Sequence, residues 1–151
     1  MADEQRGTLV AEARRLLELN RPGQALPFAD DAVALDAHDP DARTVRADIR
    51  RHLNDLAGAE TDALEALNLD PSHPEGLRAM AHVQRVLERW DACIDTATTR
   101  IRDDPRDGRA WTVRAMCYEG AGMPRKALTG AREGCSQGDP DGCALAGALE
   151  Q

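Results

Sequence analysis

The chain has 151 residues, of which 42% are hydrophobic but only 3% aromatic, and a formal net charge of −8. This length suits one ordinary domain, and the composition predicts a core of Ala, Leu and Val in closely packed helices. The acidic charge argues against a general nucleic-acid binder, because such proteins neutralise phosphates with Lys and Arg. No run of residues approaches the length of a membrane span and no basic-then-apolar leader follows Met1, so we expect a cytoplasmic protein without a membrane partner.

A spacing of 34 residues orders the chain from end to end. Two alanine columns keep this spacing, namely Ala13, Ala47, Ala81 and Ala115, and Ala29, Ala63, Ala97 and Ala131. A third column holds Ala25, Ala59, Cys93 and Ala127, and a fourth holds Asn20, Asn54, Glu88 and Gly122, where a turn is needed. Several columns in one register indicate a helical repeat array. Such arrays present an extended surface and no deep enclosed pocket, which favours binding of another macromolecule over catalysis.

Taken in chain order, the apolar periodicity predicts pairs of helices joined by tight turns. The expected helices span about 7–19 and 23–36, 41–53 and 57–69, 75–88 and 91–103, and 108–121 and 124–136, with a capping helix at about 142–150. The pairs Asp39-Pro40, Asp70-Pro71 and Asp104-Pro105 separate them, because the residue before a proline is pushed out of the helical region. We expect one domain over 1–151, with repeats at about 6–39, 40–73, 74–107 and 108–141.

This pattern resembles the tetratricopeptide repeat (TPR) family, whose unit is a 34-residue antiparallel helix pair. The residues of the fourth unit that match the family pattern are Trp111, Ala115, Tyr118, Gly122, Pro124 and Ala127. The first unit departs most, with Glu12 and Asn20 at usual Leu and Gly positions, as expected of a terminal cap. The resemblance implies an all-α, right-handed α-solenoid of four TPR-like helix pairs plus a C-terminal capping helix. It also implies a non-catalytic adaptor or scaffold for protein–protein interaction.

The four cysteines fall into two groups. Cys93 and Cys117 occupy positions where small apolar residues recur, and we interpret them as buried thiols that pack as small hydrophobes. The segment from Cys135 to Cys143 resembles Sel-like relatives of the TPR family, in which two cysteines flank the turn between helices. That resemblance implies a disulfide between Cys135 and Cys143, whereas a reducing cytoplasm would keep both as thiols, and the sequence leaves both readings open.

No catalytic or metal-binding constellation is apparent in the sequence. His38 and His73 lie in predicted inter-repeat turns, and His52 and His82 lie on predicted first helices. No two histidines have the i, i+4 spacing of a helical metal site, no cysteines form a CxxC unit, and no Gly-rich phosphate loop is present. We therefore expect no enzymatic activity, no cofactor and no metal.

The resemblance implies that the first helix of each repeat lines a concave groove. Matching groove positions are Val10, Arg14, Leu17, Thr44, Asp48, Arg51, His52, Arg78, His82, Arg85, Arg109, Thr112, Met116 and Glu119. The partner-binding side chains among them are expected to be Arg14, Arg51, His52, Arg78, His82, Arg85, Arg109 and Met116. Acidic side chains such as Asp30, Asp62 and Glu65 lie on second helices, which the resemblance places outside.

Two interpretations of the arginine-rich face stand side by side. If the guanidinium groups converge, they favour an acidic peptide partner held through bidentate carboxylate contacts. If they do not converge, Arg serves only as a good helix former on a solvated face. An alternative function is a structural module that self-associates by stacking its end faces. The Lys and Asn of the family's carboxylate clamp are not present, since Val10, Arg14, Val45 and Val113 occupy those places.

Overall fold

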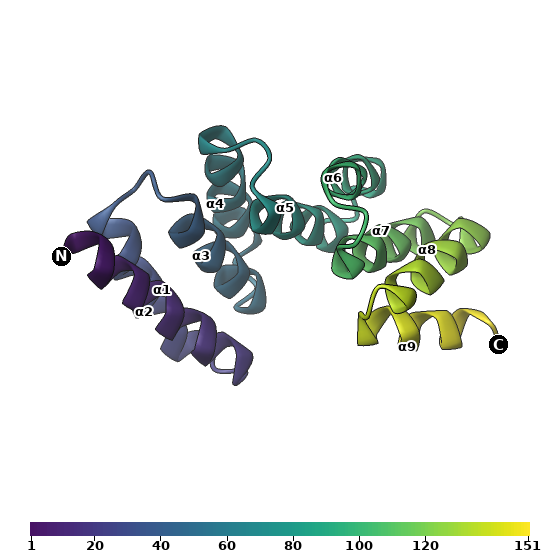
Figure 1. The fold of residues 1–151 in the computed structure, drawn as a ribbon, viewed down its shortest axis with the longest axis horizontal. Coiled ribbons are helices and arrows are strands. Elements are labelled where there is room, and N and C mark those ends of the chain that lie inside the picture. The colour runs from purple at the N-terminus through teal and green to yellow at the C-terminus, as the bar shows by residue number, and fades with distance from the viewer. The chain divides into compact units, whose positions relative to one another are not determined.

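The computed structural model describes residues 1–151 and consists of nine α-helices without any strand (Figure 1). The helices are α1 (Ala2–Glu18), α2 (Pro22–Leu35), α3 (Pro40–His52), α4 (Leu56–Leu69), α5 (Pro74–Val86), α6 (Trp90–Asp103), α7 (Gly108–Gly120), α8 (Pro124–Ser136) and α9 (Pro140–Leu149). The all-α class expected from the sequence is confirmed. The chain forms two compact units, unit 1 of Met1–Ala79 and unit 2 of Met80–Gln151. None of the helices combines the length and apolar character needed to cross a bilayer.

Helix boundaries follow the sequence prediction closely except at the two ends of the chain. The first helix begins at Ala2 instead of near residue 7, and Asp3 and Glu4 lie in its first turn, where carboxylates favour a helix N-terminus. Arg6 reinforces this turn by donating to Asp3 at 2.9 Å and to Asp39 at 2.7 Å. The last helix begins at Pro140, because the fixed φ of proline suits the first helical position.

The predicted turn column is visible in the backbone dihedral angles. Asn20, Asn54 and Glu88 have φ of 59°, 64° and 59°, and Gly122 has φ of +80°. Each of their N–H groups bonds to the carbonyl three residues earlier. A left-handed backbone conformation has a low conformational energy for glycine, a somewhat higher one for asparagine and a high one for most other residues. Because the conformation is nevertheless found at this spacing in all four repeats, the fold requires it there. The 34-residue spacing seen in the sequence is therefore also the spacing at which this backbone conformation recurs.

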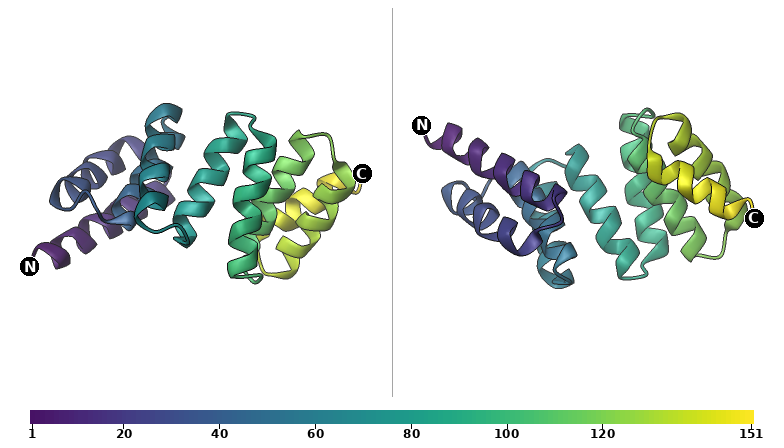
Figure 2. Two further views of the ribbon diagram at one scale, coloured as in Figure 1. Left: turned by 90° about the horizontal axis from the view of Figure 1, so that it is seen from above. Right: turned by 90° about the horizontal axis from the view of Figure 1, so that it is seen from below.

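In unit 1, small residues let neighbouring helices approach closely. The first helix packs on α2 and α3, α2 packs on α3, and α3 packs on α4 (Figure 2). The alanines Ala13, Ala47, Ala29 and Ala63 are all 0% exposed, between larger core residues such as Ile49. Because these positions have no spare volume, the alanine columns record where helices touch.

Asp62 on α4 contradicts the expectation that acidic residues of second helices face solvent. Its side chain is 0% exposed. It accepts hydrogen bonds from Arg43 Nη1 at 3.2 Å, from Arg46 Nε and Nη2 at 2.8 and 2.9 Å, and from Arg50 Nη1 at 2.9 Å. The three arginines follow one another three and four residues apart on one face of α3. A buried carboxylate requires such pairing, so this cluster ties α3 to α4.

In unit 2, two disulfides join neighbouring helices. The fully buried Cys93 and Cys117 are bonded between α6 and α7, with their Cα atoms 6.2 Å apart. The interpretation of these two residues as separate packing thiols was therefore wrong, although their burial was anticipated. Cys135 and Cys143 are bonded between α8 and α9, with Cα atoms 4.5 Å apart. Both bonds link adjacent antiparallel helices, where facing positions lie within the reach of a disulfide.

Candidate partner-binding site

Cationic side chains of three first helices act on one carboxylate in unit 1. Asp48 of α3 has a side chain 32% exposed, and its Oδ1 lies 3.8 Å from Nη2 of Arg51. Desolvation raises the pKa of Asp48, and the charges of Arg51, then His52, Arg78 and Arg14, partly lower it. Because Coulomb interactions weaken with distance and solvent screening, these four side chains lie within the range of such interactions with Asp48.

The charges around Asp48 are not balanced within this group. The one carboxylate experiences the charges of three guanidinium groups. Nε of Arg51 is buried and has no hydrogen-bond partner, and neither has Oγ1 of Thr44, two turns earlier on α3. Arg14 is exposed. The site thus brings the positive charges of three first helices to bear on one place in unit 1, which favours a carboxylate supplied from outside.

Several other positions of the expected groove pack inside the protein. Val10, Thr44 and Thr112 are 7%, 1% and 3% exposed, so they do not line a surface and their assignment to the groove was wrong. Helical periodicity placed them on the inner face of the first helices, but that face turns partly toward the neighbouring helix.

Four of the expected binding residues belong to unit 2. His82 and Arg85 on α5 are half-buried, and each has interactions within the protein. Arg109 at the start of α7 is exposed, and Met116, two turns later on the same helix, is half-buried. Seven residues of separation place Arg109 and Met116 on one helical face. Their role in binding stays a prediction.

Unit 2 also holds a basic aromatic pocket that was absent from the sequence prediction. The Arg114 guanidinium lies 4.8 Å from the ring centroid of Trp111 and 5.7 Å from that of Tyr118, and Lys126 Nζ lies 5.6 Å from the Tyr118 centroid. These residues line an open pocket of about 360 Å³ together with Arg125. The signal was present in the sequence, because Arg114 stands three and four residues from the two aromatic residues on one helix.

Solved structures of low sequence identity share this architecture. TTC0263, a TPR protein of Thermus thermophilus, has a TM-score of 0.90 at 17% identity, over 95% of this chain and 80% of that one. The fold is that of the TPR proteins. PilF of Pseudomonas aeruginosa has a TM-score of 0.86 at 16% identity, over 98% of this chain and 68% of that one. YrrB, described as a TPR protein with an unusual peptide-binding site, has a TM-score of 0.66 at 22% identity, over 93% of this chain and 74% of that one.

These identities are low enough that the similarity establishes the TPR fold alone. A scan against models of protein families finds no match, and a search of curated protein sequences finds none either. The fold therefore has to be combined with the local chemistry of the chain before a function is proposed.

Proposed function

We propose that this TPR protein is a non-catalytic adaptor that holds an acidic segment of a partner protein against the basic side chains of its first helices. The observation that carries the proposal is that the charges of Arg14, Arg51 and Arg78 all act on the carboxylate of Asp48, with Arg51 Nη2 3.8 Å from its Oδ1. Each arginine comes from a different helix, so an extended segment that lies across α1, α3 and α5 meets all three. The similarity to YrrB adds a precedent for peptide binding on this fold.

The electrostatics of the site favour a reversible interaction. Exposed ion pairs contribute about 0.2–1 kcal/mol each, and hydrogen bonds to charged groups contribute about 1.5–3 kcal/mol. Arg14 is exposed and belongs to the weaker class, whereas Arg51, with a side chain 18% exposed, lies closer to the stronger class. Binding should weaken as salt rises, because free charges are screened over about 8–10 Å near physiological ionic strength.

The test uses fluorescent peptides from an Asp- and Glu-rich synthetic library, measured by fluorescence anisotropy against the oxidised full chain. The double variant Arg14→Gln with Arg51→Gln should bind the best peptide at least about fivefold more weakly, since two charged contacts are removed. The matched control is Arg125→Gln with Lys126→Gln, which removes the same charge from the aromatic pocket of unit 2. Equal losses in both variants would show non-specific attraction, and a loss confined to the control would move the site to unit 2.

Self-association is the alternative function, and the same samples test it. A structural module would show a mass that grows with protein concentration in sedimentation velocity runs, in the absence of any peptide. An adaptor keeps the mass of a single chain until a partner is added. A monomeric chain over the micromolar range would exclude stacking of end faces as the main function.

The cytoplasmic location is part of the proposal and has a chemical test. Disulfides persist in oxidising compartments and are rare where glutathione and thioredoxin keep thiols reduced. Alkylation of the protein at the moment of cell lysis measures the state of Cys135 and Cys143, the pair that also carries the Sel-like resemblance. Free thiols at these two cysteines would support a cytoplasmic location, whereas a disulfide that resists alkylation would indicate an oxidising compartment.

A further inference from the structure

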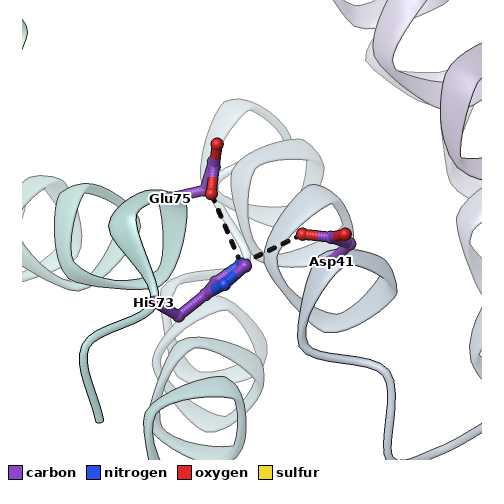
Figure 3. Close-up of side chains that lie close together, drawn as sticks. All are labelled: Asp41, His73 and Glu75. Carbon is purple, nitrogen blue, oxygen red and sulfur yellow. Dashed lines mark ion pairs between the residues drawn. The ribbon is translucent and has the colours of Figure 1, made fainter. Parts of the chain in front are cut away.

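We propose that Asp41, His73 and Glu75 of unit 1 form a binding site for a divalent metal ion of the zinc class. Figure 3 shows the three side chains pointing toward one another from the start of α3, the turn before α5 and the first turn of α5. Nε2 of His73 lies 3.2 Å from Oδ1 of Asp41 and 3.6 Å from Oε2 of Glu75. The three potential ligand atoms all lie within 4.8 Å of one another.

The state of the His73 ring provides the second observation. The residue is only 7% exposed, and Nε2 is buried without a hydrogen-bond partner, although it faces two carboxylates. On the other side of the ring, Oδ2 of Asp70 lies 3.8 Å from Nδ1. Asp70 thus lies on the opposite side of the ring from the two candidate ligand carboxylates, which is the placement of the carboxylate that orients a metal-bound histidine from behind.

The other repeats of the same chain act as an internal comparison. One repeat before and after His73, the equivalent positions are Asp39 and Asp107, and each is paired with an arginine. Arg6 Nε donates to Asp39 at 2.7 Å, and Arg100 Nε donates to Asp107 at 2.8 Å. The middle turn therefore replaces an arginine–aspartate pair with a histidine that lies beside carboxylates.

The charges near His73 call for a further cation. Three carboxylates, those of Asp41, Asp70 and Glu75, lie within 4 Å of its ring nitrogens, and Arg78 Nη2 lies 3.8 Å from Oε1 of Glu75. Asp41 and Asp70 each form an ion pair with the histidine. A divalent ion bound there would compensate the charges of the two carboxylates that reach Nε2.

Ligand types and spacings together select the class of metal. Imidazole with carboxylate oxygen suits zinc and its neighbours, whereas Ca²⁺ and Mg²⁺ prefer all-oxygen sites. Ligands about 2.1 Å from a tetrahedral zinc ion lie about 3.4 Å from one another. The separations of 3.2 and 3.6 Å at Nε2 bracket this value. Three protein ligands leave one position for water or for a group from a partner.

Equivalent positions in successive repeats supply the two carboxylates, since Asp41 and Glu75 are 34 residues apart. A metal bound there would link the first helix of the second repeat to the start of the third. We therefore expect the ion to stabilise unit 1, because a ligand that binds only the folded state raises the unfolding temperature.

Isothermal titration of Zn²⁺ into the oxidised, untagged full chain tests the proposal. Wild type should bind one ion per chain, and Asp41→Asn and Glu75→Gln should each weaken binding by about tenfold or more. Both substitutions remove a charge from a half-buried or exposed carboxylate and keep its shape, so the fold should persist, as circular dichroism will show. His38→Ala is the matched control, because His38 also lies in an inter-repeat turn near a carboxylate, Asp36, but has a side chain 81% exposed.

The outcomes separate cleanly. Tenfold losses in both carboxylate variants, unchanged binding by the His38 variant, and a Zn²⁺-dependent rise in melting temperature that the variants lack would support the site. Absence of one-to-one binding to wild type, or wild-type affinity in both carboxylate variants, would overturn it. In that case, His73 would serve only as an ion-pairing residue of the turn. His73→Ala is added as a third variant, and its result counts only if the folded helix content is retained.

Discussion

Replacing Asp62 by Asn should destabilise unit 1 more than any other single change of a carboxylate to an amide. The substitution keeps the size of the side chain but removes the charge that three arginines share, in a place that is 0% exposed. Breaking a buried pair by removal of one partner costs about 3–5 kcal/mol. The arginine side chains retain 14–25% exposure and Arg46 keeps a second partner, Asp30 at 3.3 Å, so we expect a value near the lower end, about 3 kcal/mol.

Urea unfolding of the oxidised chain, followed by circular dichroism, measures the difference. The control is Asp30→Asn on α2, which makes the same chemical change at a carboxylate with 48% exposure and one contact to Arg46. An exposed pair of this kind contributes about 0.2–1 kcal/mol. Pairing Asp62→Asn with Arg46→Gln completes a double-mutant cycle, which isolates the interaction between the two side chains.

Equal stability of the Asp62 and Asp30 variants would refute the reasoning. It would mean that the three arginines find other partners or water without cost, and that the cluster does not hold α3 against α4. A small effect of Asp62→Asn that disappears in high salt would have the same meaning, because screening acts far less on buried charges than on exposed ones.

Three further predictions follow from packing and charge. Gly142→Ala should destabilise unit 2, because a Cβ there would lie 2.8 Å from a backbone nitrogen of α8, whereas Gly147→Ala on the same helix has open space and should stabilise it by about 0.5–1 kcal/mol in thermal melts. Ala63→Leu should cost about 1–3 kcal/mol of unfolding free energy, and the exposed Ala57→Leu should cost almost none. Desolvation raises the pKa of Asp48, so the Asp48 carboxyl binds a proton more tightly in the folded protein than in the unfolded chain. The contribution of this carboxyl to stability is therefore present at low pH and is lost as pH rises through the folded pKa. Asp48→Asn should therefore gain stability relative to wild type between about pH 3 and 6, as denaturation at several pH values will measure.

The repeat architecture was accessible from the sequence because it rests on local and periodic requirements. A residue at the turn between paired helices must adopt left-handed backbone, and Asn20, Asn54, Glu88 and Gly122 do so at the predicted spacing. A position where two helices touch must be small, and Ala81 is fully buried as its column required. Each requirement concerns a single position of the repeat and returns in every repeat. The same kind of residue therefore recurs at a fixed spacing, which can be seen in the sequence.

The candidate sites were less accessible, because each depends on which side chains of different helices meet. The sequence placed Arg14, Arg51 and Arg78 on first helices, but only the assembled unit brings their charges to bear on Asp48. The same limit hid the burial of Asp62, since an acidic residue on a second helix looks identical whether it faces water or three arginines.

His73 shows how a repeat register can nevertheless point to such sites. The period aligns His73 with Asp39 and Asp107, and it aligns Asp41 with Glu75 one repeat later. Asp39 and Asp107 each form an ion pair with an arginine, whereas His73 lies beside carboxylates. The shared fold does not require this difference, which indicates chemistry particular to the middle repeat. The position concerned is the buried histidine between two carboxylates.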